Sequence, residues 1–186
     1  MTHSIVETIQ KRLGYPPLKK VDPNIQETTG NLQSSIEEKL AQSAIPVALA
    51  GFFRLTRTDE GCKAVINSNK ELNWLQKLFG NQETLAVEKV AQYAGVSNDE
   101  ARIDMEQAAR EAYKLLKEAA GEKQSAERIK TFMNSQRHSI LVYLPAAMQL
   151  GYLLNDNGMD DRTNKMEGPV SSFMHTIENK LSGGGN

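Results

Sequence analysis

The chain has 186 residues, which is long enough to bury about 70% of the surface of the unfolded chain in one core. Its 22 lysines and arginines nearly balance its 23 aspartates and glutamates, so a formal charge of -1 excludes the broadly basic surface that nucleic acid or anionic lipid would need. The single cysteine, Cys62, excludes an internal disulfide, and the first residues carry charges where a signal peptide would be apolar. We therefore expect a protein of the reducing cytoplasm.

The N-terminal third shows helical signals separated by prolines. Ser4 and Glu7 form a capping-box pattern, and Gly14 follows where a short helix would end. Two prolines within residues 15–22 predict an extended connection. Further along, apolar residues advance by fours into Pro46, where we expect a kink or a break of the helix.

The middle of the chain alternates short helical patterns with glycines. Helices are predicted over residues 62–66 and 72–79, and Trp74 is expected to be half-buried on the second. Residues 87–94 follow the i, i+3, i+4, i+7 rule of an amphipathic helix and end at Gly95.

The strongest helix signal begins at Ser97, which forms a second capping-box pattern with Glu100. A seam of apolar residues then continues for about five turns, as far as Gly121. Its members are Ala101, Met105, Ala108, Ala112, Leu115 and Ala119. Small residues dominate this seam, so we expect a neighbouring helix to approach it closely.

The longest apolar run of the chain covers residues 139–154 and is interrupted by Pro145. A helix capped by Ser125 leads into it. The run is shorter than the ~20 residues of a membrane-spanning helix, so we expect it to be buried among other helices. Residues 155–168 are predicted to form a polar loop, and Pro169 begins a last amphipathic helix.

These signals predict an all-α protein, a bundle of seven to nine helices joined by short loops. The same order of elements occurs around Pro46 and again around Pro145: a helix that meets a proline, an apolar helix, a polar loop and a closing helix. This order is either a weak internal repeat or chance reuse of helical patterns. We divide the chain into an N-terminal helix with its connection (1–30), a central helical region (31–121), a C-terminal helical region packed on it as one compact unit (125–182), and a flexible tail (183–186).

Residues 46–116 hold a set of short motifs that is more specific as a set than any one motif alone. Its members are Pro46, Leu49, Gly51, Glu60, Gly61, Leu78, Phe79, Gly80, Asn81, Val87, Ala91, Gly95, Val96 and Ser97. The set resembles the YidB-like family of uncharacterised bacterial helical proteins. The resemblance implies an all-helical fold and no assigned activity, cofactor or catalytic residue. The chain departs from the family after Ser97, because the proline expected in the following helix is absent, and residues from 125 onward lie outside the match.

Residues 87–106 look like the helix-turn-helix of LacI-type repressors, because a helix, a tight turn at Gly95 and a second helix follow one another. The second helix would have to enter the major groove, yet its first turns hold more acidic than basic residues. The acidic residues are Asp99, Glu100, Asp104 and Glu106, against the single Arg102. We therefore expect a structural helical corner, and DNA binding is kept as the second alternative function.

Charged residues gather in the polar loop and suggest a calcium-binding loop. They are Asp156, Asp160, Asp161, Arg162 and Glu167. Asp156 and Glu167 fit the first and last places of such a loop, but Gly158 stands where a ligand is needed and Asp161 where a glycine must turn the chain. We expect no metal there and keep the five charged residues as a candidate functional loop.

The histidines and the cysteine give little support for catalysis. No pair among His3, His138 and His175 has the spacing of a zinc site on a helix. Cys62 with His138 or His175 as its base is a nucleophile in principle, but a buried small apolar residue is the default role of a lone cysteine. We predict no enzymatic activity, no metal and no cofactor.

The apolar run supplies the remaining candidate surface. If the two proline-containing apolar helices are not wholly buried against each other, they expose a surface for a protein partner or an apolar ligand. Leu141, Tyr143, Leu144, Met148, Tyr152 and Leu153 would line it. Our main hypothesis is a non-enzymatic interaction or structural module that binds a protein partner or a second copy of itself. Binding of a small apolar ligand is the first alternative.

Overall fold

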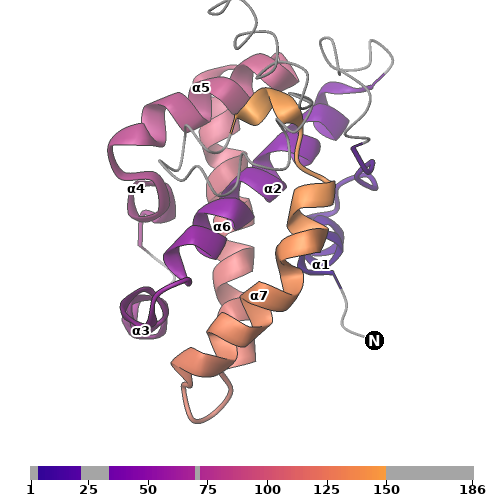
Figure 1. Ribbon diagram of the computed structural model, residues 1–186. Helices are drawn as coiled ribbons and strands as arrows, with labels where there is room; N and C mark the ends of the chain where they lie inside the picture. Colours follow the sequence, from indigo (N-terminus) through magenta and orange to yellow (C-terminus); the bar gives the residue numbers. More distant parts are fainter. Residues whose placement is uncertain (1–3, 22–33, 70–71, 150–186) are drawn as a thin grey trace, which may run out of the picture.

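The computed structural model describes residues 4–21, 34–69 and 72–149, and every regular element in these ranges is helical, which confirms the all-α class (Figure 1). The α-helices are α1 (Ile5–Leu13), α2 (Ile36–Leu55), α3 (Asp59–Asn67), α4 (Trp74–Phe79), α5 (Glu83–Ala94), α6 (Asn98–Ala120) and α7 (Ala126–Val142), with 3-10 turns η1 (Gly80–Gln82) and η2 (Ala146–Met148). The total of seven to nine helices concerned the whole chain and stays a prediction, because residues 150–186 lie outside the described ranges.

Helix α6 is the centre of the described fold, and it contacts each of the helices α1 to α5 and α7. In Figure 1, α6 runs through the middle of the bundle, α2 crosses it, and α5 lies across one end of both. The predicted seam is confirmed as far as Ala112, but Leu116 and Ala120 are then buried in place of Leu115 and Ala119. The buried face shifts by one residue because a straight helix has 3.6 residues per turn rather than 3.5.

Helix α2 continues through Pro46, so the expected break does not occur. Every residue from Leu40 to Phe53 is buried. A proline inside a helix costs about 3 kcal/mol, since it removes one hydrogen bond and crowds the preceding turn. Burial of the whole apolar segment against α6, α5 and α7 outweighs that cost. The helix begins at a capping box of Ser35 and Glu38, which was not among the predicted helix starts.

The apolar run at 139–154 is not one helix. Helix α7 ends at Val142, and Pro145 is buried in an extended conformation between α7 and η2, with φ -64° and ψ 136°. The prediction of a second helix containing a proline is therefore wrong for Pro145. The helix ends before this residue because proline has no backbone N–H to donate to the preceding turn and disfavours a helical conformation at the residue before it. The repeat stays a prediction, because the remainder of its second half lies outside the described residues.

The short helix α4 lies between α2 and α6 and carries the largest fully buried side chain. Trp74 is completely buried rather than half-buried, so the prediction was wrong. Its ring centroid lies 5.0 Å from that of Phe52 on α2 and 4.8 Å from that of Tyr113 on α6. The short apolar pattern of this helix does not show that α2 and α6 cover Trp74 on both sides.

Both ends of α4 are fixed by side chains of the neighbouring helices. At its start, Asn73 caps the helix and the Glu106 carboxylate of α6 accepts a hydrogen bond of 3.0 Å from the backbone N–H of Leu75. At its end, the Arg54 guanidinium of α2 donates to the carbonyl oxygen of Leu78 at 2.6 Å. A six-residue helix is marginal alone, so these contacts and the burial of Trp74 stabilise it.

The N-terminal segment 4–21 consists of α1 and an irregular stretch, as predicted from Ser4, Gly14 and the prolines. Buried glutamines attach it to the bundle. Gln136 of α7 accepts a hydrogen bond from the backbone N–H of Ile5 at 2.8 Å. Gln42 of α2 accepts from the backbone N–H of Lys19 at 2.8 Å and donates to the Lys19 carbonyl oxygen at 2.9 Å.

None of the helices in the described ranges combines the length and the apolar character that crossing a lipid bilayer requires.

Candidate functional site

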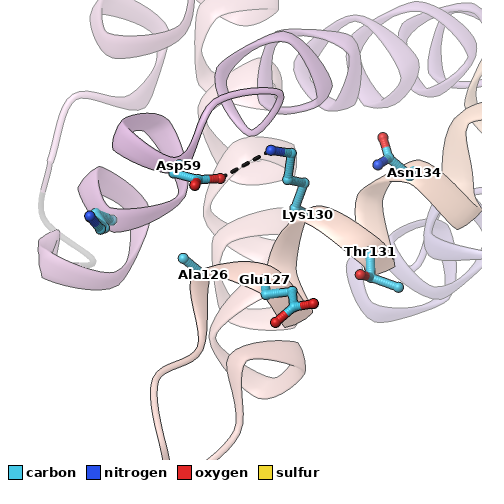
Figure 2. A pocket seen from close by; sticks show the side chains of 7 residues that line it. Asp59, Ala126, Glu127, Lys130, Thr131 and Asn134 are labelled. Atoms are coloured by element: carbon cyan, nitrogen blue, oxygen red, sulfur yellow. Dashed lines mark hydrogen bonds and ion pairs between the residues drawn. The ribbon is translucent and has the colours of Figure 1, made fainter.

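A surface pocket of about 550 Å³ lies between α3 and α7. We call it the α3–α7 pocket (Figure 2). It is lined by Asp59, Lys63, Ala126, Glu127, Lys130, Thr131 and Asn134. The lining is polar except for one alanine, and six of the seven side chains carry a charge or a hydrogen-bonding group.

The α7 side of the pocket is a stripe at helical spacing. Glu127, Lys130, Thr131 and Asn134 occupy positions i, i+3, i+4 and i+7, so they share one face of the helix. The face with Ile129 and Met133 is buried. The apolar residues of the buried face predicted α7, whereas no function was predicted for the polar face. The same spacing would have revealed the stripe, although not the helix opposite it.

The α3 side of the pocket depends on a close approach between α3 and the end of α2. Thr58 caps α3 by accepting a hydrogen bond from the N–H of Gly61 at 3.0 Å. A Cβ atom at position 61 would lie 1.7 Å from the carbonyl oxygen of Leu55, so this turn requires a glycine. The turn places Asp59 and Lys63, one helical turn apart, at the mouth of the pocket.

Two of the charges in the pocket are paired with each other. Figure 2 shows Asp59 of α3 and Lys130 of α7 pointing toward one another across the pocket, with 3.0 Å between the carboxylate oxygen and Nζ. The hydrogen bond to Asp59 raises the pKa of Lys130 above its ordinary value. By contrast, Lys63 and Glu127 form no ion pair or side-chain hydrogen bond with any other described residue. The pocket therefore offers one unpaired cation and one unpaired anion on opposite helices.

Cys62 lies next to Lys63 in the chain but is completely buried. Its Sγ donates to the backbone carbonyl oxygen of Thr56 at 3.3 Å, and burial raises the pKa of the thiol. His138, proposed as its base, is exposed on α7, while His175 lies outside the described residues. These are the surroundings of a structural cysteine, since a reactive one needs a lowered pKa and access.

The residues predicted to form an apolar surface lie largely in the core. Tyr143, Leu144 and Met148 are 6%, 6% and 1% exposed, and Leu141 is partly buried. Tyr152 and Leu153 lie outside the described residues.

Tyr143 has a structural role at the centre of this group. Its hydroxyl donates to the Glu7 carboxylate at 2.9 Å, and its carbonyl oxygen accepts a hydrogen bond from Gln42. Burial, followed by the hydrogen bond to Glu7, raises the pKa of Tyr143 above its ordinary value. These contacts connect α7 to α1 and α2.

The predicted acidic loop, with Asp156, Asp160, Asp161, Arg162 and Glu167, lies wholly outside the described residues. Within the ranges that the structure does describe, no three His, Cys, Asp or Glu side chains are arranged to hold a metal ion.

The predicted helical corner is confirmed in its local structure. Gly95 ends α5 with φ 75°, and Ser97 forms the capping box with Glu100. Hydrogen bonds from the Ser97 backbone and hydroxyl lower the pKa of the Glu100 carboxyl, so this acid stays charged at the exposed start of α6. Arg102, the basic residue of that region, pairs with Glu83 of α5. The corner thus presents acidic groups, which repel a phosphate backbone.

Comparison with known proteins found no match: no family model, no curated protein and no solved structure is similar to the chain.

Proposed function

We propose that the protein is a non-enzymatic interaction module and that the α3–α7 pocket is its contact site for another protein. The observation that carries this proposal is that Lys63 on α3 and Glu127 on α7, charges of opposite sign in one surface pocket, have no ion-pair partner among the residues that the structure describes. Exposed charges without an ion-pair partner among the described residues can select and orient a partner.

The chemistry of the pocket favours a protein over a small apolar ligand. Sites for small molecules are mostly apolar and enclose most of their ligand, whereas the rim of a protein interface is polar and accessible to water. Ala126 is the only apolar residue of the lining, and Glu127, Thr131 and Asn134 are exposed.

The two alternatives have less support. The apolar-ligand hypothesis needs an open surface at Tyr143, Leu144 and Met148, and these side chains are core residues. The DNA hypothesis needs basic groups at the start of α6, where Arg102 is paired and Glu100 remains charged. Neither is part of the proposal.

Several finer predictions belong with this proposal. Membership of the YidB-like family over residues 46–116, the total of seven to nine helices, the internal repeat and a cytoplasmic location all remain proposals for the whole chain.

Site-specific photocrosslinking tests the contact site. A photoreactive amino acid replaces Thr131 in the pocket or, as the matched control, Gln76, which is exposed on α4. In cells that make the protein at its native level, we expect a covalent protein adduct from position 131 and none from position 76. Adducts from both positions, or from neither, would overturn the proposal.

A further inference from the structure

We infer that the partner is a second copy of this chain, bound about a two-fold axis that passes through the α3–α7 pocket. This inference rests on the proposed function and adds the identity of the partner. It is drawn from the arrangement of charges in the pocket.

The unpaired charges of the pocket complement themselves. In a two-fold dimer, any contact from residue i to residue j occurs twice, because j of the first copy also meets i of the second. Lys63 and Glu127 lie on opposite helices of the pocket. A two-fold rotation therefore brings Lys63 of each copy to Glu127 of the other copy. Because each copy contributes one cation and one anion, the dimer contains two intermolecular ion pairs.

The remaining lining residues are compatible with this symmetry. Asp59 and Lys130 already neutralise one another within each copy, so neither charge needs a partner across the axis. The Asn134 amide and the Thr131 hydroxyl both donate and accept hydrogen bonds, so either can pair with a donor or an acceptor of the second copy. The small side chain of Ala126 leaves room for the second copy.

Such a dimer is weak and sensitive to salt. Exposed ion pairs contribute little free energy because water and ions screen them, so they fix the orientation of the copies more than the affinity. Added salt should therefore weaken the dimer.

Sedimentation velocity at low ionic strength, with the full chain, provides the test. We expect the wild type to dimerise and added salt to weaken the dimer. Lys63→Glu alone places two glutamates opposite each other at both contacts, and Glu127→Lys alone does the same with lysines. Each variant should raise the dissociation constant about ten-fold or more.

Mixing the two variants gives the decisive result. A Lys63→Glu copy and a Glu127→Lys copy present opposite charges at both contacts, so their equimolar mixture should dimerise as the wild type does. Lys77→Glu on α4 and Glu122→Lys after α6 are matched controls at exposed positions, and both should dimerise normally.

A wild type that stays monomeric at low salt, variants that dimerise as well as the wild type, or a mixture that does not recover would each overturn the inference. If the inference fails while position 131 still forms an adduct with a different protein, the proposed function stands with another partner.

Discussion

Two regions of the bundle are held by different interactions. The centre, where α4 lies between α2 and α6, is held by apolar contacts: Trp74 lies against Phe52 and Tyr113, and hydrogen bonds occur at the ends of the helix. The N-terminal segment 4–21 is held to α2 and α7 by buried amides as well as by its own apolar residues. The stability of the centre depends on the volume that its apolar side chains fill. The stability of the N-terminal segment depends in addition on hydrogen bonds from side chains.

The contrast shows how a short helix and an irregular segment are each made stable. Helix α4 has few backbone bonds of its own and gains stability from the area that Trp74 buries. The stretch after α1 forms no helix, so the N–H and C=O of Lys19 need side-chain partners, and Gln42 supplies both from one amide. Disrupting each region should therefore have different consequences.

The largest effect is expected from Trp74→Ala at the centre. It should lower the free energy of unfolding by about 3–5 kcal/mol, because it leaves a cavity between α2 and α6. Urea denaturation followed by circular dichroism measures this loss. Trp74→Phe, which keeps much of the volume, should cost clearly less. A loss below about 1 kcal/mol for the alanine variant would show that apolar burial does not stabilise the centre.

The next effect is expected from Gln42→Met in the second region. Methionine has a similar size but leaves the two Lys19 backbone groups and the Tyr143 carbonyl oxygen without their partner. Unpaired buried groups cost about 1–3 kcal/mol each, and water can reach some of them, so we expect a loss of about 2–3 kcal/mol.

Hydrogen exchange distinguishes this loss from general destabilisation. In the Gln42→Met variant, residues 15–21 should exchange faster while α4 keeps its protection. Gln92→Met, at an exposed position of α5, serves as the control and should change little. If hydrogen exchange became equally faster in residues 15–21 and in α4, the two regions would not be stabilised independently.

A smaller, pH-dependent effect is expected at two tyrosines near the N-terminal segment. Burial, followed by hydrogen bonds to Asp104 and Glu7 respectively, raises the pKa values of Tyr15 and Tyr143. A phenol with a raised pKa in the folded state keeps its proton longer than in the unfolded chain. Its contribution is complete below the ordinary tyrosine pKa of about 10 and is lost as the pH rises toward the folded value.

Urea midpoints between pH 8 and pH 11 measure this loss. The wild type should lose stability above about pH 10, and the double variant with Tyr15→Phe and Tyr143→Phe should lose less. At neutral pH each single substitution should cost about 0.5–1.5 kcal/mol for its hydrogen bond. If the wild type and the double variant lost stability equally between pH 8 and pH 11, ionisation of Tyr15 and Tyr143 would not be the cause of the loss.

The smallest effect is expected from Lys130→Ala in the α3–α7 pocket. This ion pair is exposed to water, so its removal should leave the melting temperature unchanged within error. Differential scanning calorimetry provides the measurement. A clear fall in melting temperature would assign the pocket a structural role comparable to that of the other two regions.

The described helix boundaries that were predicted correctly share a local cause. Ser97 and Ser125 cap helices through hydrogen bonds to the backbone three residues ahead, and Gly14 and Gly95 end helices in a conformation with positive φ. Such signals involve neighbouring residues only, so the order of amino acids contains them. The box of Ser35 and Glu38 is equally local and could have been found.

The candidate site was harder to predict, because it joins two helices that are far apart in the chain. The polar stripe of α7 can be read from the spacing of Glu127, Lys130 and Thr131, but nothing in that spacing indicates that Asp59 lies opposite. The apolar surface predicted at Tyr143 and Met148 shows the converse: apolar residues were found, but their burial depends on elements that the spacing does not place.

The amino-acid order by itself determined the all-α class, the helix ends at Gly14, Gly95, Ser97 and Ser125, and the buried face of α6 as far as Ala112, because capping and helical periodicity act over a few residues. The tertiary structure alone decided that α2 continues through Pro46, that Trp74 is fully covered, and that Gln42 holds Lys19. Each of these outcomes depends on groups from distant parts of the chain, and their free energy exists only once the helices are packed together.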